Sequence, residues 1–395
     1  MKRIKGGITA PLGFTAAGVA CGIKKSRKDL AIVVSEKPCV AAGVFTTNKV
    51  KAAPVEVTRR CLRRQRAASA VVVNSGNANC CTGERGFQDA LRMTEVCGEA
   101  TGIPPGEVLV ASTGPIGKVL PMGKIEKGIR HAASILRKQG ARDAAEAILT
   151  TDTVAKEIAV AETIAGKKVR LGAMAKGAGM ISPKMATMLA FVTTDAVIEE
   201  SSLQECLTNA VNKSFNRITV DGDRSTNDMV LALANGLARN REIRRGAGLK
   251  TFQEMLEFAC SELAKMIVKD GEGATRFITV TVKGARSLQQ ADKAARAVAD
   301  SKLVKTALHG GSPNWGRIMA SLGYSGASVR REFVDIYLCG IKVAGGGERT
   351  DFDAGKLSEA LRGKELEVIA DLNLGEFEQM IWTCDLTAEY VAINK

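Results

Sequence analysis

Short apolar runs alternate with stretches of helical periodicity through the first half of the chain. The runs are rich in Val, Ile and Ala and end at turn residues, which is typical of buried strands. The expected strands are 29–34, 69–74, 107–111, 157–162 and 168–174. Apolar residues spaced three and four apart predict helices over 86–102, 124–137 and 141–149. The first half is therefore expected to combine sheets with covering helices.

The second half continues in the same style. The expected helices are 202–211, 228–237, 252–268 and 288–299. The expected strands are 218–221, 277–283, 334–343 and 365–372. No internal repeat, low-complexity tract or evident linker interrupts the pattern. The fold class predicted from the whole pattern is α/β (α+β), with sheets covered by helices.

A glycine-rich segment near the middle, K-G-A-G-M-I-S-P-K-M-A-T-M-L-A-F-V-T-T-D-A (176–196), has a different character. Gly177 and Gly179 permit unusual backbone conformations and Pro183 fixes φ, so the approach to Ala186 is expected to be a shaped loop. The apolar run that follows predicts a buried strand. Thr187 is thus expected at the first position of that strand.

This placement of Thr187 has a chemical consequence. If the Ala186–Thr187 bond were cut, Thr187 would carry both a hydroxyl nucleophile and a free α-amine as its base. The pKa of an unperturbed α-amine, about 7.7–8.0, is close to neutral pH. The alternative is that Thr187 is only a β-branched residue at the start of a core strand. For an isolated Ala-Thr pair, that alternative would be the better interpretation.

The overall charge invites a nucleic-acid interpretation. The net charge is +14 and the isoelectric point is about 9.4. The Lys and Arg residues are scattered, however, and no nucleic-acid-binding motif accompanies them. Only 4% of residues are aromatic, which argues against a stacking surface for single strands. A basic surface that attracts carboxylate substrates is favoured, and an RNA- or DNA-binding protein stays as an alternative of another class.

The numbers of cysteine and histidine residues limit which disulfides and catalytic sites the chain can form. The 10 cysteines show no C-x-x-C spacing, and the adjacent pair Cys80–Cys81 is poorly placed for a disulfide, so reduced thiols are expected. The 2 histidines are His131, in an amphipathic helix, and His309, beside two glycines and a weak catalytic candidate. No apolar run is long enough to span a bilayer and no signal-peptide core follows Met1, so a cytoplasmic protein is expected.

The central segment closely resembles the self-processing segment of ornithine acetyltransferases (glutamate N-acetyltransferases) of arginine biosynthesis. Further matching stretches are V-A-S-T-G-P-I-G (110–117), T-T-D-T (150–153), F-N-R-I-T-V-D-G-D-R-S-T-N-D (215–228), K-D-G-E-G-A-T (269–275), N-W-G-R-I (314–318) and C-D-L-T (384–387). They occur in order along nearly the whole chain. The resemblance implies self-cleavage between Ala186 and Thr187, with Thr187 as the nucleophile.

The resemblance also implies an architecture. It is a layered α-β-β-α sandwich like that of N-terminal-nucleophile enzymes, with a smaller C-terminal α/β domain. The catalytic core is expected over residues 1–285 and the smaller domain over 286–395. Self-cleavage would give fragments 1–186 and 187–395, assembled as a heterotetramer with two copies of each.

Site residues follow from the matching motifs. The resemblance makes Thr113 and Gly114 the oxyanion hole, although S-T-G-P alone would be an ordinary turn. It makes Lys176, otherwise expected to be a solvated lysine, a substrate ligand that could pair with an α-carboxylate. Glu272, otherwise an exposed acid in a glycine turn, becomes a second ligand.

The resemblance implies two further ligands. Thr150 matches a substrate-binding Thr, with Thr151 as the alternative register. Asn394 matches a C-terminal ligand, and the final Ser or Thr usual in the family has no counterpart before Lys395. The cluster Asp221, Asp223 and Asn227 fits no Ca²⁺ loop and is expected to support the site instead.

The implied reaction moves acetyl from N²-acetylornithine to glutamate through acetyl-Thr187. No cofactor or metal is expected, and acetyl-CoA as a second acetyl donor is left open. The alternative is an N-terminal-nucleophile amidase or aminopeptidase, in which water is the acceptor. The expected partners are small-molecule substrates, with neither nucleic acid nor membrane.

Overall fold

The computed structural model describes residues 1–65, 67–182 and 188–395. They form two compact units. The larger unit comprises 1–180, 188–216 and 224–267 of the described residues. The smaller unit comprises 181–182, 217–223 and 268–395. Thr187 and Ala186 lie outside the described residues.

One mixed sheet organises the larger unit. Its strands are β1 (Lys2–Arg3), β2 (Phe14–Val19), β3 (Leu30–Phe45), β4 (Ala67–Ser75), β5 (Val108–Thr113), β6 (Lys156–Ile164), β7 (Lys167–Lys176), β8 (Leu189–Thr194) and β9 (Met229–Ala234). In the described residues the order is β1-β6-β7-β8-β9-β3-β4-β5, and β2 also pairs with β3. Strands β4 and β5 are parallel, as are β8 and β9.

The long strand β3 joins two layers of this sheet. Its first half pairs with β2 and β4, its second half pairs with β9, and the register with β4 shifts between Val34 and Cys39. One hydrophobic core contains side chains from β4 and β5 together with side chains from β8 and β9. Two β layers therefore face each other across this core.

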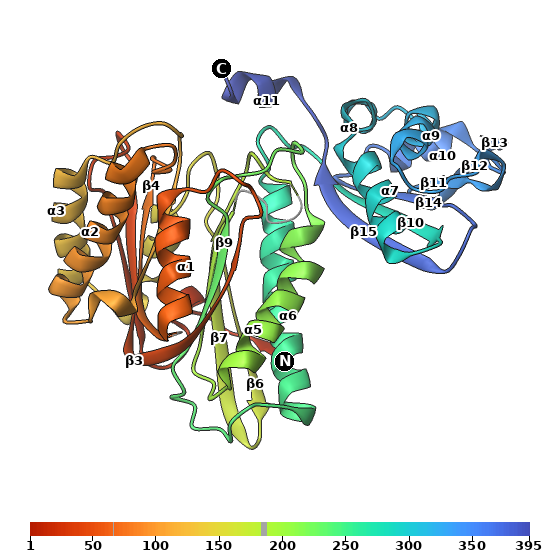
Figure 1. The fold of residues 1–395 in the computed structure, drawn as a ribbon. Helices are drawn as coiled ribbons and strands as arrows, with labels where there is room; N and C mark the ends of the chain where they lie inside the picture. The colour runs from red at the N-terminus through yellow and green to blue at the C-terminus, as the bar shows by residue number, and fades with distance from the viewer. Residues whose placement is uncertain (66, 183–187) are drawn as a thin grey trace. The chain divides into compact units, whose positions relative to one another are not determined.

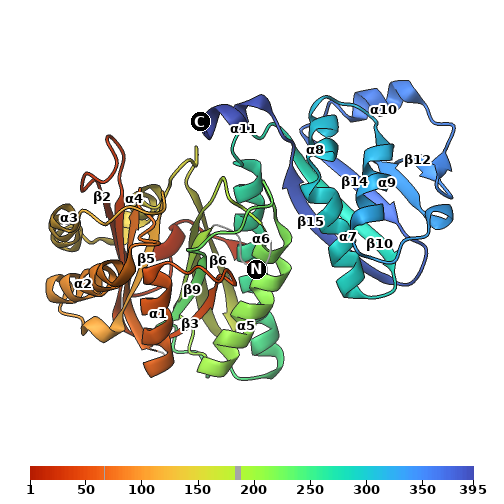
Figure 2. The same cartoon turned by 45° about the horizontal axis from the view of Figure 1, so that its top comes forward.

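Helices cover the outer faces of the two layers (Figures 1 and 2). The helices of this unit are α1 (Ala53–Gln65), α2 (Gly83–Thr101), α3 (Met122–Ser134), α4 (Ala141–Ala147), α5 (Glu200–Lys213) and α6 (Gly246–Lys269, which ends in the smaller unit). Val72 and Val110 point toward α2 and α3, whereas their neighbours Val71 and Ala111 point into the inner core. This alternation is the strand period of two. The predicted α-β-β-α layering is confirmed.

The helix predicted over 228–237 is wrong. The segment Met229–Ala234 is strand β9, fully buried between β8 and β3. Met, Leu and Ala favour helices, but pairing on both edges and burial on both faces override that preference. The strand predicted over 218–221 is also wrong, because Ile218 makes only an isolated bridge with Trp382.

A second sheet forms the smaller unit, in the order β13-β12-β11-β14-β10-β15. Its strands are β10 (Phe277–Ala285), β11 (Asp335–Leu338), β12 (Ile341–Gly345), β13 (Glu348–Arg349), β14 (Glu365–Asp371) and β15 (Phe377–Cys384). Its helices are α7 (Leu288–Asp300), α8 (Lys302–His309), α9 (Trp315–Tyr324), α10 (Ala354–Ala360) and α11 (Ala388–Ile393). Residues 277–285 were expected in the catalytic core over 1–285. They form β10 instead, which pairs with β14 and β15 and so belongs to the sheet of the smaller unit.

Short 3₁₀ helices complete the secondary structure, at Gly7–Thr9, Pro105–Glu107, Lys138–Gly140, Phe215–Arg217 and Arg331–Phe333. All ten cysteines are unpaired, and the sulfur atoms of Cys80 and Cys81 are 3.7 Å apart. Among the described residues, no helix has the length and apolar character needed to cross a bilayer.

Candidate active site

The candidate oxyanion residues lie where two parallel strands end. Thr113 is the last residue of β5 and lies opposite Ser75, the last residue of β4. The backbone N–H of Asn77 donates to the Thr113 carbonyl at 3.0 Å. Gly114 has φ +140°, and a Cβ there would lie 2.4 Å from the Asn77 nitrogen. Only glycine therefore allows this close approach of two backbone segments.

A buried asparagine holds the same segment from the other side. The Asn227 side-chain amide donates to the carbonyls of Ser112 and Ala78, at 2.8 and 2.7 Å. The Ser112 hydroxyl in turn donates to the side chain of Asn74 at 2.6 Å. These hydrogen bonds fix the backbone that leads into Thr113. Asn227 thus has the supporting role expected from the sequence.

Asp228, the next residue, contacts the segment that follows Thr187. Its Oδ1 accepts the backbone N–H of Met188 at 3.0 Å. The side chain is fully buried, and among the described residues Oδ2 has no hydrogen-bond partner. Burial raises the pKa of this carboxyl well above its usual range. Burial therefore favours the neutral form of the carboxyl that lies beside the residue adjacent to the proposed nucleophile.

Lys176 is buried, with 2% of its surface exposed, so the interpretation as a solvated lysine is wrong. Its Nζ lies 3.9 Å from Asp152 Oδ2. The other oxygen, Oδ1, accepts from Lys156 Nζ at 2.8 Å and from the Gly177 N–H at 2.7 Å. Burial by itself raises the pKa of Asp152, but Lys176 and Lys156 hold it well below its usual range.

Thr150 joins this cluster through its backbone. Its N–H donates to Asp152 Oδ2 at 3.0 Å, so Asp152 brings Thr150 and Lys176 together. Thr150 is half-buried, whereas Thr151 is exposed. The motif T-T-D-T predicted a substrate ligand through its threonines, and the role of Asp152 was not predicted. The signal was available, because a buried strand that starts with Lys156 needs a nearby counter-charge.

The remaining two candidate ligands lie in the smaller unit and are hydrogen-bonded to each other. The Asn394 side-chain amide donates to Glu272 Oε2 at 2.7 Å. Thr387, at the start of α11, donates its hydroxyl to the Gly273 carbonyl at 2.8 Å. These two hydrogen bonds join the turn that contains Glu272 and Gly273 to the C-terminal helix α11. Asp221 adds a third contact, since it accepts from Tyr390 at 3.3 Å.

His309 takes part in a structural hydrogen-bond cluster with Asp385 and Thr275 rather than in a catalytic triad. Its Nδ1 lies 2.7 Å from Asp385 Oδ2, which also accepts the Thr275 hydroxyl at 2.5 Å. In a nucleophilic triad the hydroxyl would bond the far ring nitrogen, whereas here Thr275 lies on the Nδ1 side, at 3.5 Å. Asp385 also accepts the backbone N–H groups of Thr275 and Arg276, which fixes the start of β10.

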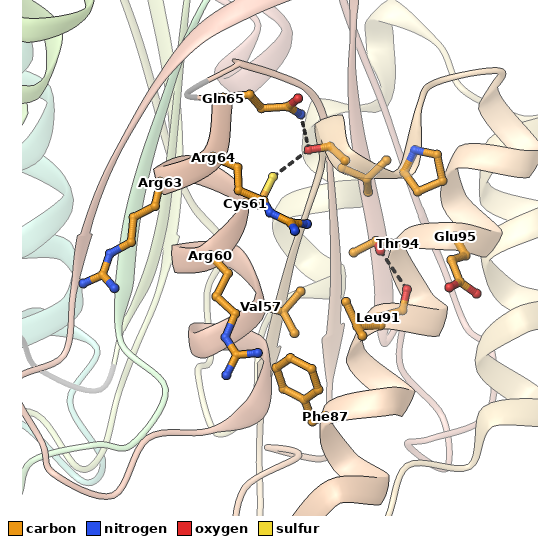
Figure 3. Close-up of a pocket in the computed structure, with 13 residues that line it drawn as sticks. Val57, Arg60, Cys61, Arg63, Arg64, Gln65, Phe87, Leu91, Thr94 and Glu95 are labelled. Atoms are coloured by element: carbon orange, nitrogen blue, oxygen red, sulfur yellow. Dashed lines mark hydrogen bonds between the residues drawn. The ribbon is translucent and has the colours of Figure 1, made fainter.

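A surface hollow of about 650 Å³ lies between α1 and α2 (Figure 3). Arg60, Cys61 and Arg64 line one side, and Phe87 and Leu91 line the other. None of the candidate site residues lines it, so this hollow is not the candidate active site. In the described part of the chain no three His, Cys, Asp or Glu side chains are grouped as a metal site requires.

Comparison with known proteins gives matches along the whole chain. The model of the ArgJ family matches residues 15–395. The arginine biosynthesis bifunctional protein ArgJ of Symbiobacterium thermophilum is 52% identical over 398 residues, covering 100% of this chain and 99% of that protein. The protein of the same name from Caldanaerobacter subterraneus subsp. tengcongensis is 47% identical over 399 residues, again covering 100% and 99%.

A solved structure is also similar. The crystal structure of the arginine biosynthesis bifunctional protein argJ from Bacillus halodurans has 43% sequence identity and a TM-score of 0.50. The match covers 52% of this chain and 97% of that chain. The crystallised chain is therefore about half as long as this one.

Proposed function

Because the chain belongs to the ArgJ family, it is an acyltransferase of arginine biosynthesis, and we propose that it transfers acetyl from N²-acetylornithine to glutamate through an ester on Thr187. One observation carries the proposal. The consecutive residues Asn227 and Asp228 tie the Ser112 carbonyl and the Met188 N–H to one point of the fold. The candidate oxyanion segment and the residue next to Thr187 are thus held by the same short stretch.

The first step is self-cleavage. The Thr187 hydroxyl attacks the Ala186 carbonyl, the peptide nitrogen leaves as the Thr187 amine, and water hydrolyses the resulting ester. The products are fragments 1–186 and 187–395. The half-length crystallised relative is what one fragment of such a precursor would look like, which supports this step.

The second step is acetyl transfer. The α-amine of Thr187 takes the proton of its own hydroxyl, whose oxygen attacks the acetyl carbonyl. Backbone donors at Thr113 and Gly114 stabilise the oxyanion, and one such donor is typically worth about 3–4 kcal/mol. The carbon–nitrogen bond breaks, ornithine leaves with the proton, and acetyl-Thr187 remains. The glutamate amine then attacks this ester and regenerates the hydroxyl.

The substrate ligands that we propose from the matching motifs are Lys176, Thr150, Glu272 and Asn394. Lys176 is suited to the α-carboxylate that acetylornithine and glutamate share, because burial strengthens an ion pair. Glu272 is suited to the ornithine ammonium.

We also propose the remaining features of the enzyme. The nucleophile, base and oxyanion donors all belong to the chain, so the reaction needs no metal or cofactor. The relatives named bifunctional support acetyl-CoA as a second donor to the same Thr187 ester. A cytoplasmic heterotetramer with two copies of each fragment is the proposed assembly.

The fate of the acetyl group tests the proposal. With labelled acetylornithine, glutamate should be required for turnover, and double-reciprocal plots for the two substrates should be parallel. Little acetate should appear without glutamate. Rapid acetate release that glutamate does not suppress would instead make water the acceptor and favour the amidase.

A further inference from the structure

Lys24 extends from a turn whose backbone is fixed. The carboxylate of Asp29 accepts four consecutive backbone N–H groups. These belong to Cys21, Gly22, Ile23 and Lys24, at 2.6, 3.1, 2.7 and 2.9 Å. A carboxylate that accepts several backbone N–H groups holds a loop rigidly. The position from which the Lys24 side chain starts is therefore well defined.

The side chain of Lys24 runs between two parts of the candidate active site. Its Cγ passes so close to Gly76 that a Cβ there would lie 2.8 Å away, and Gly76 itself packs against Gly114. At the far end, Lys24 Nζ donates to the carbonyl of Leu149 at 2.9 Å. Leu149 directly precedes Thr150. The side chain thus runs from the candidate oxyanion segment to the residue before a candidate substrate ligand, where its ammonium group lies.

The local charges are unbalanced in favour of an anion. Lys24 joins Lys156 and Lys176, and Arg27 adds another positive charge, whereas Asp29 and Asp152 are the carboxylates that act on Lys24. Both carboxylates already accept backbone N–H groups. In the described part of the chain Lys24 itself makes no ion pair. A partly buried excess of positive charge is costly unless a negative ligand completes it.

We propose that Lys24 binds a carboxylate of the amino-acid substrate while the acetyl group lies at Thr113 and Gly114. This inference rests on the proposed function and adds a specificity-determining residue to it. Acetylornithine and glutamate share an α-carboxylate, and glutamate has a second carboxylate on its side chain. Either carboxylate has the chemistry that Lys24 would recognise.

The ionisation of Lys24 makes its role measurable. Burial lowers its pKa to about 8. Arg27 and Lys176 lower the pKa further, whereas Asp29 and Asp152 oppose them. Lys124 also lies at this turn and donates to the Gly22 carbonyl. The free enzyme therefore loses the Lys24 charge above about pH 8, and affinity for a carboxylate falls with it.

Steady-state kinetics of Lys24→Met, Lys24→Arg and Lys25→Met test the proposal. Lys25 is the exposed neighbour and serves as the matched control. In a double-displacement mechanism, kcat/KM for each substrate reports on its own half-reaction. Lys24→Met should lower kcat/KM by about 10- to 100-fold, the loss expected for one charge-assisted hydrogen bond. Lys25→Met should match the wild type, and Lys24→Arg should recover part of the loss.

The pattern of losses identifies which carboxylate is bound. A loss with both substrates assigns Lys24 to the α-carboxylate, and a loss with glutamate alone assigns it to the side-chain carboxylate. In the wild type, kcat/KM for acetylornithine should decline above about pH 8, and Lys24→Arg should remove that decline.

Two results would overturn the inference. One is unchanged kcat/KM with both substrates in a Lys24→Met variant that self-cleaves and melts like the wild type. The other is a wild-type profile without the decline, which needs no variant to fold. Failure of the proposed function is separate, because the wild type itself would then show no glutamate-dependent transfer.

Discussion

At the scale of single residues, Asp228 combines two requirements that conflict. It is fully buried, which favours the neutral form, yet its Oδ1 accepts the Met188 N–H. A neutral carboxyl can satisfy both, because its carbonyl oxygen still accepts. Positioning of the backbone next to Thr187 therefore depends on the acceptor at 228 rather than on its charge.

This argument predicts different results for two substitutions of Asp228. Asp228→Asn keeps an acceptor and should fold and self-cleave. Asp228→Ala leaves a buried N–H without a partner, so the free energy of unfolding should fall by about 1–3 kcal/mol and self-cleavage should slow. Denaturant unfolding and the time course of fragment formation measure both quantities. Equal cleavage and equal stability in the Ala variant and the wild type would refute the positioning role.

At the scale of secondary-structure elements, Asp152 connects the loop after α4 with strands β6 and β7. It accepts from Lys156 and from the N–H of Gly177, beside Lys176. Removing this carboxylate would take one negative charge away from two buried ammonium groups. Loss of one partner of a buried ion pair typically costs about 3–5 kcal/mol.

Asp152→Asn should therefore lower the free energy of unfolding by about 3–5 kcal/mol at neutral pH. The control is Asp143→Asn, whose ion pairs with Lys28 and Arg137 are partly exposed and should contribute about 0–1 kcal/mol. Lys176 and Lys156 hold the pKa of Asp152 below its ordinary value of 3.8 in the fold. Its contribution is thus complete above that value and is lost as the pH falls, so the two proteins should converge in strong acid. A variant as stable as the control at neutral pH would contradict this account.

Secondary structure was predicted correctly where the hydrophobic pattern of a segment agrees with the strand pairing that the segment makes in the fold. The strand expected over 69–74 is confirmed as β4, because its alternating side chains serve two different cores. The segment 229–234 was predicted wrongly, since a fully buried strand of Met, Leu and Ala shows no period of two. Its pairing partners, β3 and β8, are distant in the sequence and only the fold supplies them.

At the scale of the whole molecule, the motifs gave the family and the layered fold, but not the charges of the site. Lys24 and Asp228 went unrecognised because their significance depends on burial and on neighbours far away in the chain. Lys176 was identified only through resemblance, and its burial is a property of the folded unit. Single-residue roles therefore required the structure, whereas fold class did not.

The central claim is that this chain cuts itself before Thr187 and then carries acetyl on that residue. Intact-mass spectrometry after incubation with acetylornithine, without glutamate, tests both parts at once. The account predicts fragments 1–186 and 187–395, with one acetyl group on the N-terminal Thr187 of the second fragment. Thr187→Ala should give one uncut and unacetylated chain, whereas Thr187→Ser should still cleave. An active enzyme whose chain stays intact, or which carries the acetyl group elsewhere, would contradict the account.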